Sequence, residues 1–264
     1  MRIISIVLSV ALVALLTGLC LFEGVGGGVI HAGSYLSRLW PPEMSYLPRL
    51  IPAVAETLKM SLIGSSLAAI SAVPLSFFGY KGLVKNTVIY AATRFILSVL
   101  RATPVMVLAI MFVAAVGLGP VPGILGIWFH STGALGKFMS ETLDAADRSV
   151  QEAASIDGAT RWQSFVNVLL PMQANAFLSY YLYYIEANFR DAVMLGIVGA
   201  GGIGLELLAA IGMFAYRRVG LIVLTVISTA LVLDFFSRWV RRRFLEGYNE
   251  PSTEKRRKAT PALV

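Results

Sequence analysis

Six apolar stretches limit the fold of this chain more than any other feature of its sequence. A helix that crosses a bilayer needs about 20 largely apolar residues. Stretches approaching that length occur at residues 3–22, 58–78, 104–117, 124–138, 174–185 and 219–239. The middle three are short alone, so we expect them to draw on flanking residues such as 88–100 and 165–170. Only 14% of the residues are charged, against about 25% in soluble domains. The sequence therefore predicts an all-α, polytopic membrane helical bundle of about six transmembrane helices.

The first apolar stretch is open to two interpretations, a retained helix or a cleaved signal peptide. It is longer than the usual run of about 7–15 residues and no A-x-A site follows, which favours a retained helix. The residues LTGLC suggest a lipoprotein signal, but Leu19 is not the small residue expected before Cys20. We expect residues 1–50 to hold this helix and an external loop whose prolines oppose long helices, with the second helix starting near Val54. A single cysteine permits no intrachain disulfide and no Cys-based metal site.

A net charge of +7 could suggest that the chain binds nucleic acid. The basic residues are, however, unevenly divided between the two sides of the predicted bundle. Most of them fall on the side that holds both termini, while the opposite side carries Arg38, Arg49, Arg190, Arg217 and Arg218. This asymmetry obeys the positive-inside rule and predicts a multi-pass protein with both termini in the cytoplasm. The basic tail at residues 241–264 is predicted to be disordered and to lie against anionic lipid, with no nucleic acid bound.

The stretch GIVGAGGIGLEL at residues 196–207 contains Gly199-x-Gly201-x-x-Gly204, which fits a dinucleotide-binding fingerprint. That fingerprint needs a strand before the glycines and an acidic residue about twenty positions further on. Here polar and charged residues, NFRD, open the preceding segment, and no carboxylate follows Glu206 until Asp234. The nucleotide interpretation is therefore disfavoured.

The longest polar interruption between predicted spans, at residues 140–164, faces the predicted cytoplasm. Ser149-x-x-Glu152 fits a capping box at a helix start, and Gly158 is suited to ending a helix. We therefore predict a short helix at about residues 149–158. Ala153 and Ala154 leave part of its surface nearly without side chains, so another protein could dock there closely. An ordinary solvated loop helix would carry the same signals.

The same loop resembles a known family signature. The EAA motif in permease subunits of type I ABC importers reads EAA-x3-G-x9-I-x-L-P, and this chain fits it, with one Val for Ile, at Glu152, Ala153, Ala154, Gly158, Val168, Leu170 and Pro171. Residues 101–141 and the segment VGAGGIG are similar to permeases of the phosphonate and methionine import groups, the phosphonate type more closely. The resemblance implies the type I importer fold, with a permease core at residues 51–240 and a separate N-terminal helix.

This resemblance implies a transport subunit in a bacterial inner membrane rather than an enzyme. The short helix would be a coupling helix that enters a cleft of an ATPase, and its contact residues would be Glu152, Ala153, Ala154, Asp157 and Gly158. Leu170 and Pro171 would fix the angle at which the loop re-enters the membrane. The sequence contains no G-x4-G-K-[ST] phosphate loop, so ATP and Mg would be bound by the partner and no cofactor by this chain. The implied assembly is a homodimer with two ABC ATPase subunits and an extracytoplasmic substrate-binding protein.

The resemblance also implies a small oxyanion as cargo, such as phosphonate, phosphite or phosphate, which proteins bind with Arg, Lys and backbone amides. The candidate residues of the translocation path and gate are Arg94, Arg101, Glu186, Arg190, Gly199, Gly201, Gly202 and Gly204. Arg94 and Arg101 could instead reach lipid headgroups, and Arg190 could pair with Glu186. His31 and His130 are isolated and suggest no metal site. The alternative function is an ion-coupled secondary transporter of small anions, which would need carboxylates or histidines in mid-membrane. Asp234 is the main candidate for that role.

Overall fold

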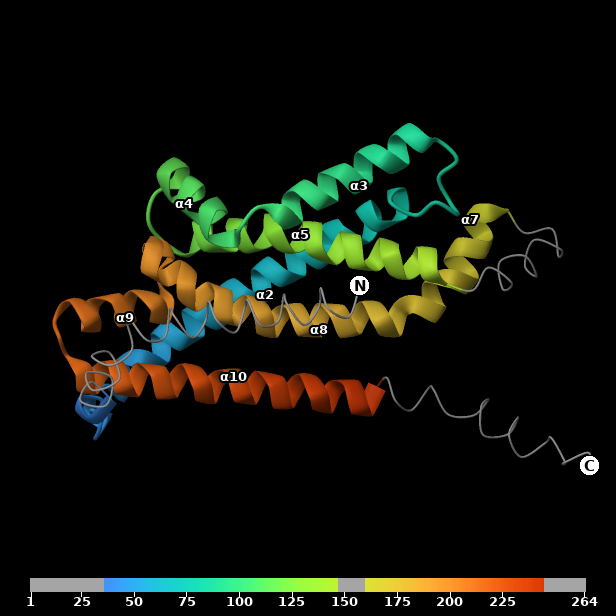
Figure 1. Cartoon of the computed structure of the whole chain (residues 1–264). Coiled ribbons are helices and arrows are strands. Elements are labelled where there is room, and N and C mark those ends of the chain that lie inside the picture. The colour runs from blue at the N-terminus through green and yellow to red at the C-terminus, as the bar shows by residue number, and fades with distance from the viewer. Residues whose placement is uncertain (1–35, 147–159, 245–264) are drawn as a thin grey trace, which may run out of the picture.

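The computed structural model describes residues 36–146 and 160–244, and these residues form helices joined by short connections (Figure 1). The predicted first helix and the predicted short helix at residues 149–158 lie outside the described residues, as do residues 245–264 of the predicted tail. Residues 241–244, predicted to be disordered as the start of that tail, instead form the last turn of α10 (Tyr216–Phe244). The elements are η1 (Met44–Tyr46), α2 (Leu47–Phe78), α3 (Thr87–Ala102), α4 (Val105–Val116), α5 (Pro120–Ala145), α7 (Arg161–Ser164), η2 (Phe165–Leu169), α8 (Leu170–Leu195), η3 (Gly196–Ala200), α9 (Gly202–Gly212) and α10 (Tyr216–Phe244).

Four long helices, α2, α5, α8 and α10, run along the length of the bundle, and α3 lies against part of α5 (Figure 1). We call the end that holds α7, the last turn of α5 and the last turn of α2 the loop end. The end that holds α4, η3, α9 and the start of α10 is the far end. Residues 147–159 connect α5 to α7 at the loop end.

The described residues supply fewer clear spans than the six that we predict. Two segments are long and apolar enough to cross a membrane, Met44–Phe78 and Tyr216–Arg243. Two further spans result if α3 with α4, bent by 85°, and Arg161–Ala200 with α9, bent by 61°, each count as one. Helix α5 has 26 residues, roughly 39 Å, yet it falls outside this set. It packs against α2, α3, α4 and α8, so protein rather than lipid covers much of its surface and strong apolarity is not required.

The start of the second helix differs from the prediction. It begins at Leu47 rather than near Val54 and contains Pro48 and Pro52. Pro48 lies in the first turn, where backbone amides have no partner within the helix and a missing N–H costs little. Pro48 is therefore compatible with a helix start, whereas Pro52 lies inside the helix and removes one of its backbone hydrogen bonds.

Glycines on α5 allow α3 and α4 to approach it closely. A Cβ at Gly133 would lie 2.5 Å from the backbone nitrogen of Arg101, and one at Gly126 would lie 3.2 Å from the backbone nitrogen of Ala109. Such small residues permit close helix packing in membranes. They set the bent pair of α3 and α4 against the middle of α5.

Candidate functional site

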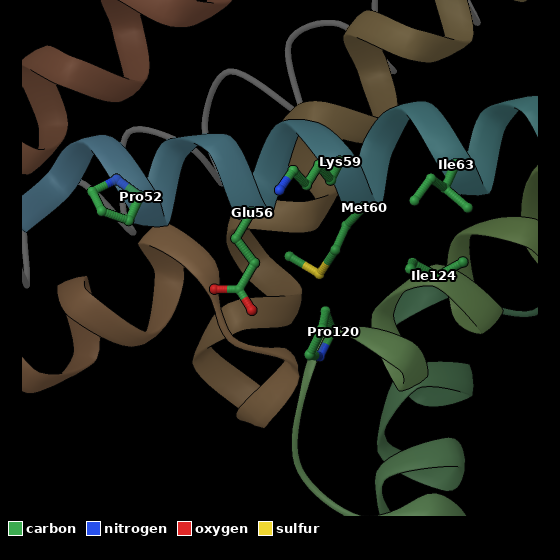
Figure 2. Close-up of a pocket in the computed structure, with 7 residues that line it drawn as sticks. All are labelled: Pro52, Glu56, Lys59, Met60, Ile63, Pro120 and Ile124. Carbon is green, nitrogen blue, oxygen red and sulfur yellow. The ribbon is translucent and has the colours of Figure 1, made fainter.

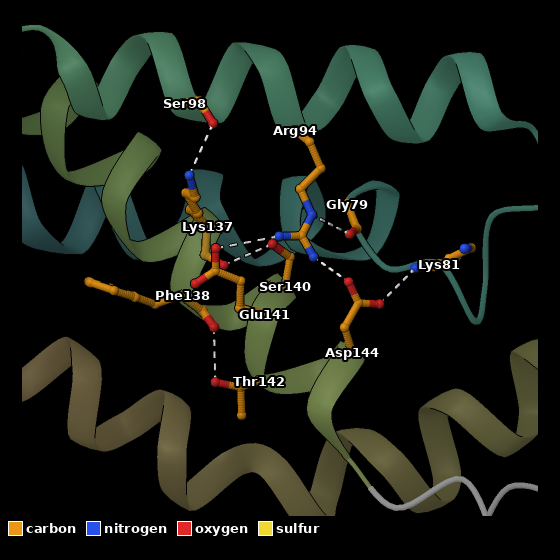
Figure 3. Close-up of polar contacts among 10 residues, drawn as sticks. All are labelled: Gly79, Lys81, Arg94, Ser98, Lys137, Phe138, Ser140, Glu141, Thr142 and Asp144. Carbon is orange, nitrogen blue, oxygen red and sulfur yellow. Dashed lines mark hydrogen bonds and ion pairs between the residues drawn. The ribbon is translucent and has the colours of Figure 1, made fainter. Parts of the chain in front are cut away.

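At the loop end, Arg94 joins three segments of the chain (Figure 3). Its Nε donates to the carbonyl oxygen of Gly79 at 3.0 Å, its Nη2 pairs with Asp144, and its Nη1 lies 3.6 Å from Glu141. The backbone N–H of Lys81 donates to the other oxygen of Asp144 at 3.1 Å. We call these five residues the loop-end clamp. The clamp ties the last turn of α5, just before residues 147–159, to α3 and to the turn after α2.

The chain is also anchored where it returns from residues 147–159. Thr160 forms a capping box with Gln163, the hydroxyl of Thr160 accepting from the Gln163 amide at 3.3 Å. Next to it, the rings of Trp162 and Phe165 contact the ring of Phe77 near the end of α2, with centroids 6.4 and 4.9 Å away. Both sides of the loop therefore meet the same end of α2.

The predicted hinge residues Leu170 and Pro171 open α8, directly after the π-helical turn η2. Proline has no N–H for the carbonyl of Asn167 four residues earlier, and its ring crowds that carbonyl. A π-helical turn is one way in which a helix accommodates such a disruption. The predicted ATPase-contact residues Glu152, Ala153, Ala154, Asp157 and Gly158 lie outside the described residues.

At the far end, the four predicted glycines form the bend between α8 and α9. Gly199, Gly201 and Gly202 have φ of 100°, 84° and 66°. Residues other than glycine rarely adopt such positive φ values. A Cβ at Gly204 would collide with the carbonyl oxygen of Val193. The dinucleotide fingerprint needs a strand before its glycines, whereas α8 and η3 are helical. These glycines shape the 61° bend between the two helices.

Helix α2 holds this bend through two polar side chains. The carboxylate of Glu56 accepts from the Gly202 amide at 3.0 Å, and the hydroxyl of Thr57 accepts from the Ile203 amide at 3.0 Å. These amides open α9, whose N-cap, Gly201, has no side chain of its own. Glu56 therefore caps α9 from a neighbouring helix and its charge complements the helix dipole.

A pocket of about 440 Å³ adjoins this cap, between α2 and the start of α5 (Figure 2). Its lining combines two charged side chains with apolar ones and consists of Pro52, Glu56, Lys59, Met60, Ile63, Pro120 and Ile124. The turn before α5 also contacts the bend, since the Gly119 amide donates to the Gly199 carbonyl at 3.0 Å.

In the middle of the bundle, Arg101 lies over the ring of Phe138, with its Cζ 4.9 Å from the ring centroid. Phe138 stacks on Tyr180 at 5.8 Å and lies 6.3 Å from Tyr184. Arg94 and Arg101 thus occupy different surroundings, although they share a face of α3 as predicted. Arg94 is held by carboxylates at the loop end, and Arg101 is set against aromatic rings.

The other predicted charges pair locally. Arg190 Nη1 lies 2.6 Å from Glu186 Oε1, which is the pairing that the sequence left open. Asp234, the candidate for an ion-coupled mechanism, pairs with Arg238 at 2.5 Å. Among the residues that the structure describes, no group of three or more His, Cys, Asp or Glu side chains could hold a metal ion.

Several contact residues were not identified from the sequence, among them Glu56, Thr57 and Asp144. Glu56 had a usable signal, because a carboxylate inside an apolar helix needs a partner. Asp144 had none, since it stands among other polar residues next to a loop.

Comparison with known proteins gives consistent matches. The family described as "Binding-protein-dependent transport system inner membrane component" matches residues 64–246. The phosphite transport system permease protein PtxC of Stutzerimonas stutzeri is 32% identical over 246 residues, covering 91% of this chain and 88% of that protein. The phosphate-import permease protein PhnE of Mycolicibacterium smegmatis is 32% identical over 80% of this chain and 40% of its own length. The inward-facing MetNI methionine ABC transporter superposes with a TM-score of 0.67 at 19% identity, over 76% of this chain and 98% of that chain.

Proposed function

Because this chain belongs to the family of binding-protein-dependent transport system inner membrane components, we propose that it forms half of the translocation path of an importer for a small phosphorus oxyanion. It is a permease subunit of an ABC importer, and its fold is that of type I importer permeases. Membership of this family implies an ATPase and a substrate-binding protein as partners. The comparisons give no support to an ion-coupled secondary transporter.

The observation that carries the proposal is the anchoring of the loop that bears the EAA pattern. Residues 147–159 leave α5 beside the loop-end clamp and return at a capped helix whose aromatic rings pack on α2. Because both ends of the loop are anchored, a force applied to it by an ATPase would be transmitted to the helices of the bundle. We assign the ATPase contact to Glu152, Ala153, Ala154, Asp157 and Gly158, with ATP and Mg held by the partner.

The cargo, the stoichiometry and the orientation are further parts of the proposal. Similarity to permeases named for phosphite and phosphate supports a phosphorus oxyanion, and two copies of the chain would enclose one path. The loop end carries a concentration of basic residues, namely Lys81, Lys85, Lys137, Arg161, Arg241, Arg242 and Arg243. By the positive-inside rule, this end lies in the cytoplasm, together with both termini. The far end then faces the binding protein.

Two measurements on the co-expressed importer test this assignment. Glu152→Arg and Gly158→Trp should each remove the ATPase that co-purifies with the tagged permease, because charge and bulk replace the small contact surface. Arg243→Glu is the matched control, since it changes charge by the same amount on an exposed side chain at the same end, and we expect it to retain the ATPase. ATPase association that survives both loop substitutions would refute the coupling role. Uptake of labelled phosphite or phosphate without ATP, driven by an ion gradient, would refute the importer mechanism.

A further inference from the structure

Arg101 stands at the middle of the bundle rather than at a membrane surface. Its backbone packs directly on Gly133 of α5, because a Cβ added to Gly133 would lie only 2.5 Å from the backbone nitrogen of Arg101. Gly133 is near the midpoint of α5, which runs from Pro120 to Ala145. At about 1.5 Å per residue, either end of α5 is roughly 18–20 Å from this contact. Snorkelling to a headgroup from such a depth exceeds the reach of an arginine side chain.

The side of α3 that carries Arg101 is the side turned away from lipid. Val88, Phe95 and Val99 form an exposed apolar stripe along α3, as expected of a surface in contact with acyl chains. Successive residues of a helix are about 100° apart, which places Arg101 opposite that stripe. It shares this inner side with Leu97, which is fully buried against α5.

Despite this depth, Arg101 has no hydrogen-bond or ion-pair partner within the described part of the chain. Its guanidinium contacts the ring of Phe138, and the phenol of Tyr184 lies within electrostatic reach. Its side chain is nevertheless exposed. A cation inside a membrane protein normally faces a partner or a water-filled cavity. Within the described residues, five other arginines already have carboxylate partners, namely Arg49, Arg94, Arg190, Arg218 and Arg238.

We infer that Arg101 is the cationic contact for the oxyanion in mid-membrane, with Phe138 and Tyr184 forming the wall beside it. The guanidinium has a planar set of donors that matches two oxygens of a phosphate or phosphite group. The aromatic rings hold it in place without neutralising its charge, so it remains available to a passing anion. This inference rests on the proposed function and names the residue at which the cargo is bound during transit.

The test uses the whole importer, with its ATPase and binding protein, in proteoliposomes, and phosphate and phosphite as labelled probes. Arg101→Gln should lower uptake per ATP hydrolysed about tenfold or more, because charge-assisted hydrogen bonds are lost. Arg101→Lys keeps the positive charge and should retain more uptake than Arg101→Gln. This graded loss would distinguish removal of the charge from misfolding of the variant. Arg243→Gln, which removes an exposed charge at the loop end, should match the wild type. Uptake by Arg101→Gln at the wild-type level would overturn the inference.

Two other partners for Arg101 would produce different results. If it held a lipid phosphate, adding phosphatidylglycerol to phosphatidylcholine vesicles would stabilise the wild type and not Arg101→Gln, while uptake by the two stayed equal. Asp191, a half-buried carboxylate of α8, is a candidate partner from a second copy. If Arg101 paired with it there, Asp191→Asn would cause the same loss as Arg101→Gln and the double variant would lose no more. Either pattern overturns the inference. Failure of the wild-type importer to take up any of the probes would instead count against the proposed function.

Discussion

Replacement of Arg94 by Gln tests the loop-end clamp quantitatively. The side chains of Arg94 and Asp144 are 20% and 26% exposed, so their ion pair is shielded from most solvent. A hydrogen bond to a charged group in such a setting contributes about 1.5–3 kcal/mol. The Glu141 side chain is 46% exposed and 3.6 Å away, and exposed pairs contribute about 0–1 kcal/mol. We therefore expect Arg94→Gln to cost about 2–4 kcal/mol in all, including the lost donor to Gly79.

A double-mutant cycle assigns that cost to its partners. The unfolding free energy is measured by titrating the detergent-solubilised permease with dodecyl sulfate, with tryptophan fluorescence as the signal. Trp162 beside Phe77 makes the loop end visible to this probe. The cycle of Arg94→Gln with Asp144→Asn should give a coupling energy of about 1–3 kcal/mol. The matched cycle with Glu141→Gln should give less than about 1 kcal/mol.

Two outcomes would refute the reasoning. Additive effects of Arg94→Gln and Asp144→Asn would mean that the pair is not formed in the membrane protein. Equal coupling energies of Arg94 with Glu141 and with Asp144 would mean that the solvent exposure of the carboxylate does not determine how much each ion pair contributes. In the assembled importer, the clamp variants should also hydrolyse more ATP per anion transported, because the root of the loop is loosened. An unchanged ratio would show that the clamp has no part in coupling.

Two further predictions concern the far end. Glu56→Ala should speed hydrogen exchange at the Gly202 amide and lower the free energy of unfolding by about 0.5–2 kcal/mol, because a helix cap is lost. Glu56→Gln keeps an acceptor and should lower it less. Equal hydrogen exchange at Gly202 in the two variants would contradict the capping role. Gly204→Ala should reduce the yield of folded permease, since its Cβ would collide with the Val193 carbonyl, while Gly212→Ala, with nothing within 4 Å, should be tolerated. Comparable melting temperatures for these two alanine variants would show that the bend can relax.

Local signals in the sequence were sufficient to predict the helical class. Apolar stretches predicted helices because a bilayer imposes a minimum length. The family resemblance added the role of the loop, which composition and periodicity alone left open between a docking helix and a solvated one.

The contacts between distant segments could not be predicted in the same way. Residues 94 and 144 are fifty positions apart, and only the packing of α3 on α5 brings them together. The start of α2 was misplaced because proline was taken as a breaker where the first helical turn accepts it. The 85° bend between α3 and α4 was missed because residues 88–100 were taken as an extension of the apolar stretch at residues 104–117, and hydropathy does not show how two successive helices are oriented.

Helix α2 holds the start of α9, takes part in a buried polar contact midway and ends at the loop-end clamp, which makes it the structural link between the two ends. Its 32 residues extend roughly 48 Å. It meets the loop-end clamp after its last turn and holds the start of α9 through Glu56 and Thr57. Midway, Ser65 accepts from Asn188, which in turn accepts from Ser131 at 3.0 Å, so α2, α8 and α5 are joined inside the bundle. A helix held at three levels transmits a tilt as a unit except where its backbone is weakened. Pro74, which lacks an amide for its i−4 carbonyl, lies between the middle and the loop end. Bending under load should therefore concentrate at Pro74, leaving the cap of α9 and the buried serine–asparagine contacts to move together as one body.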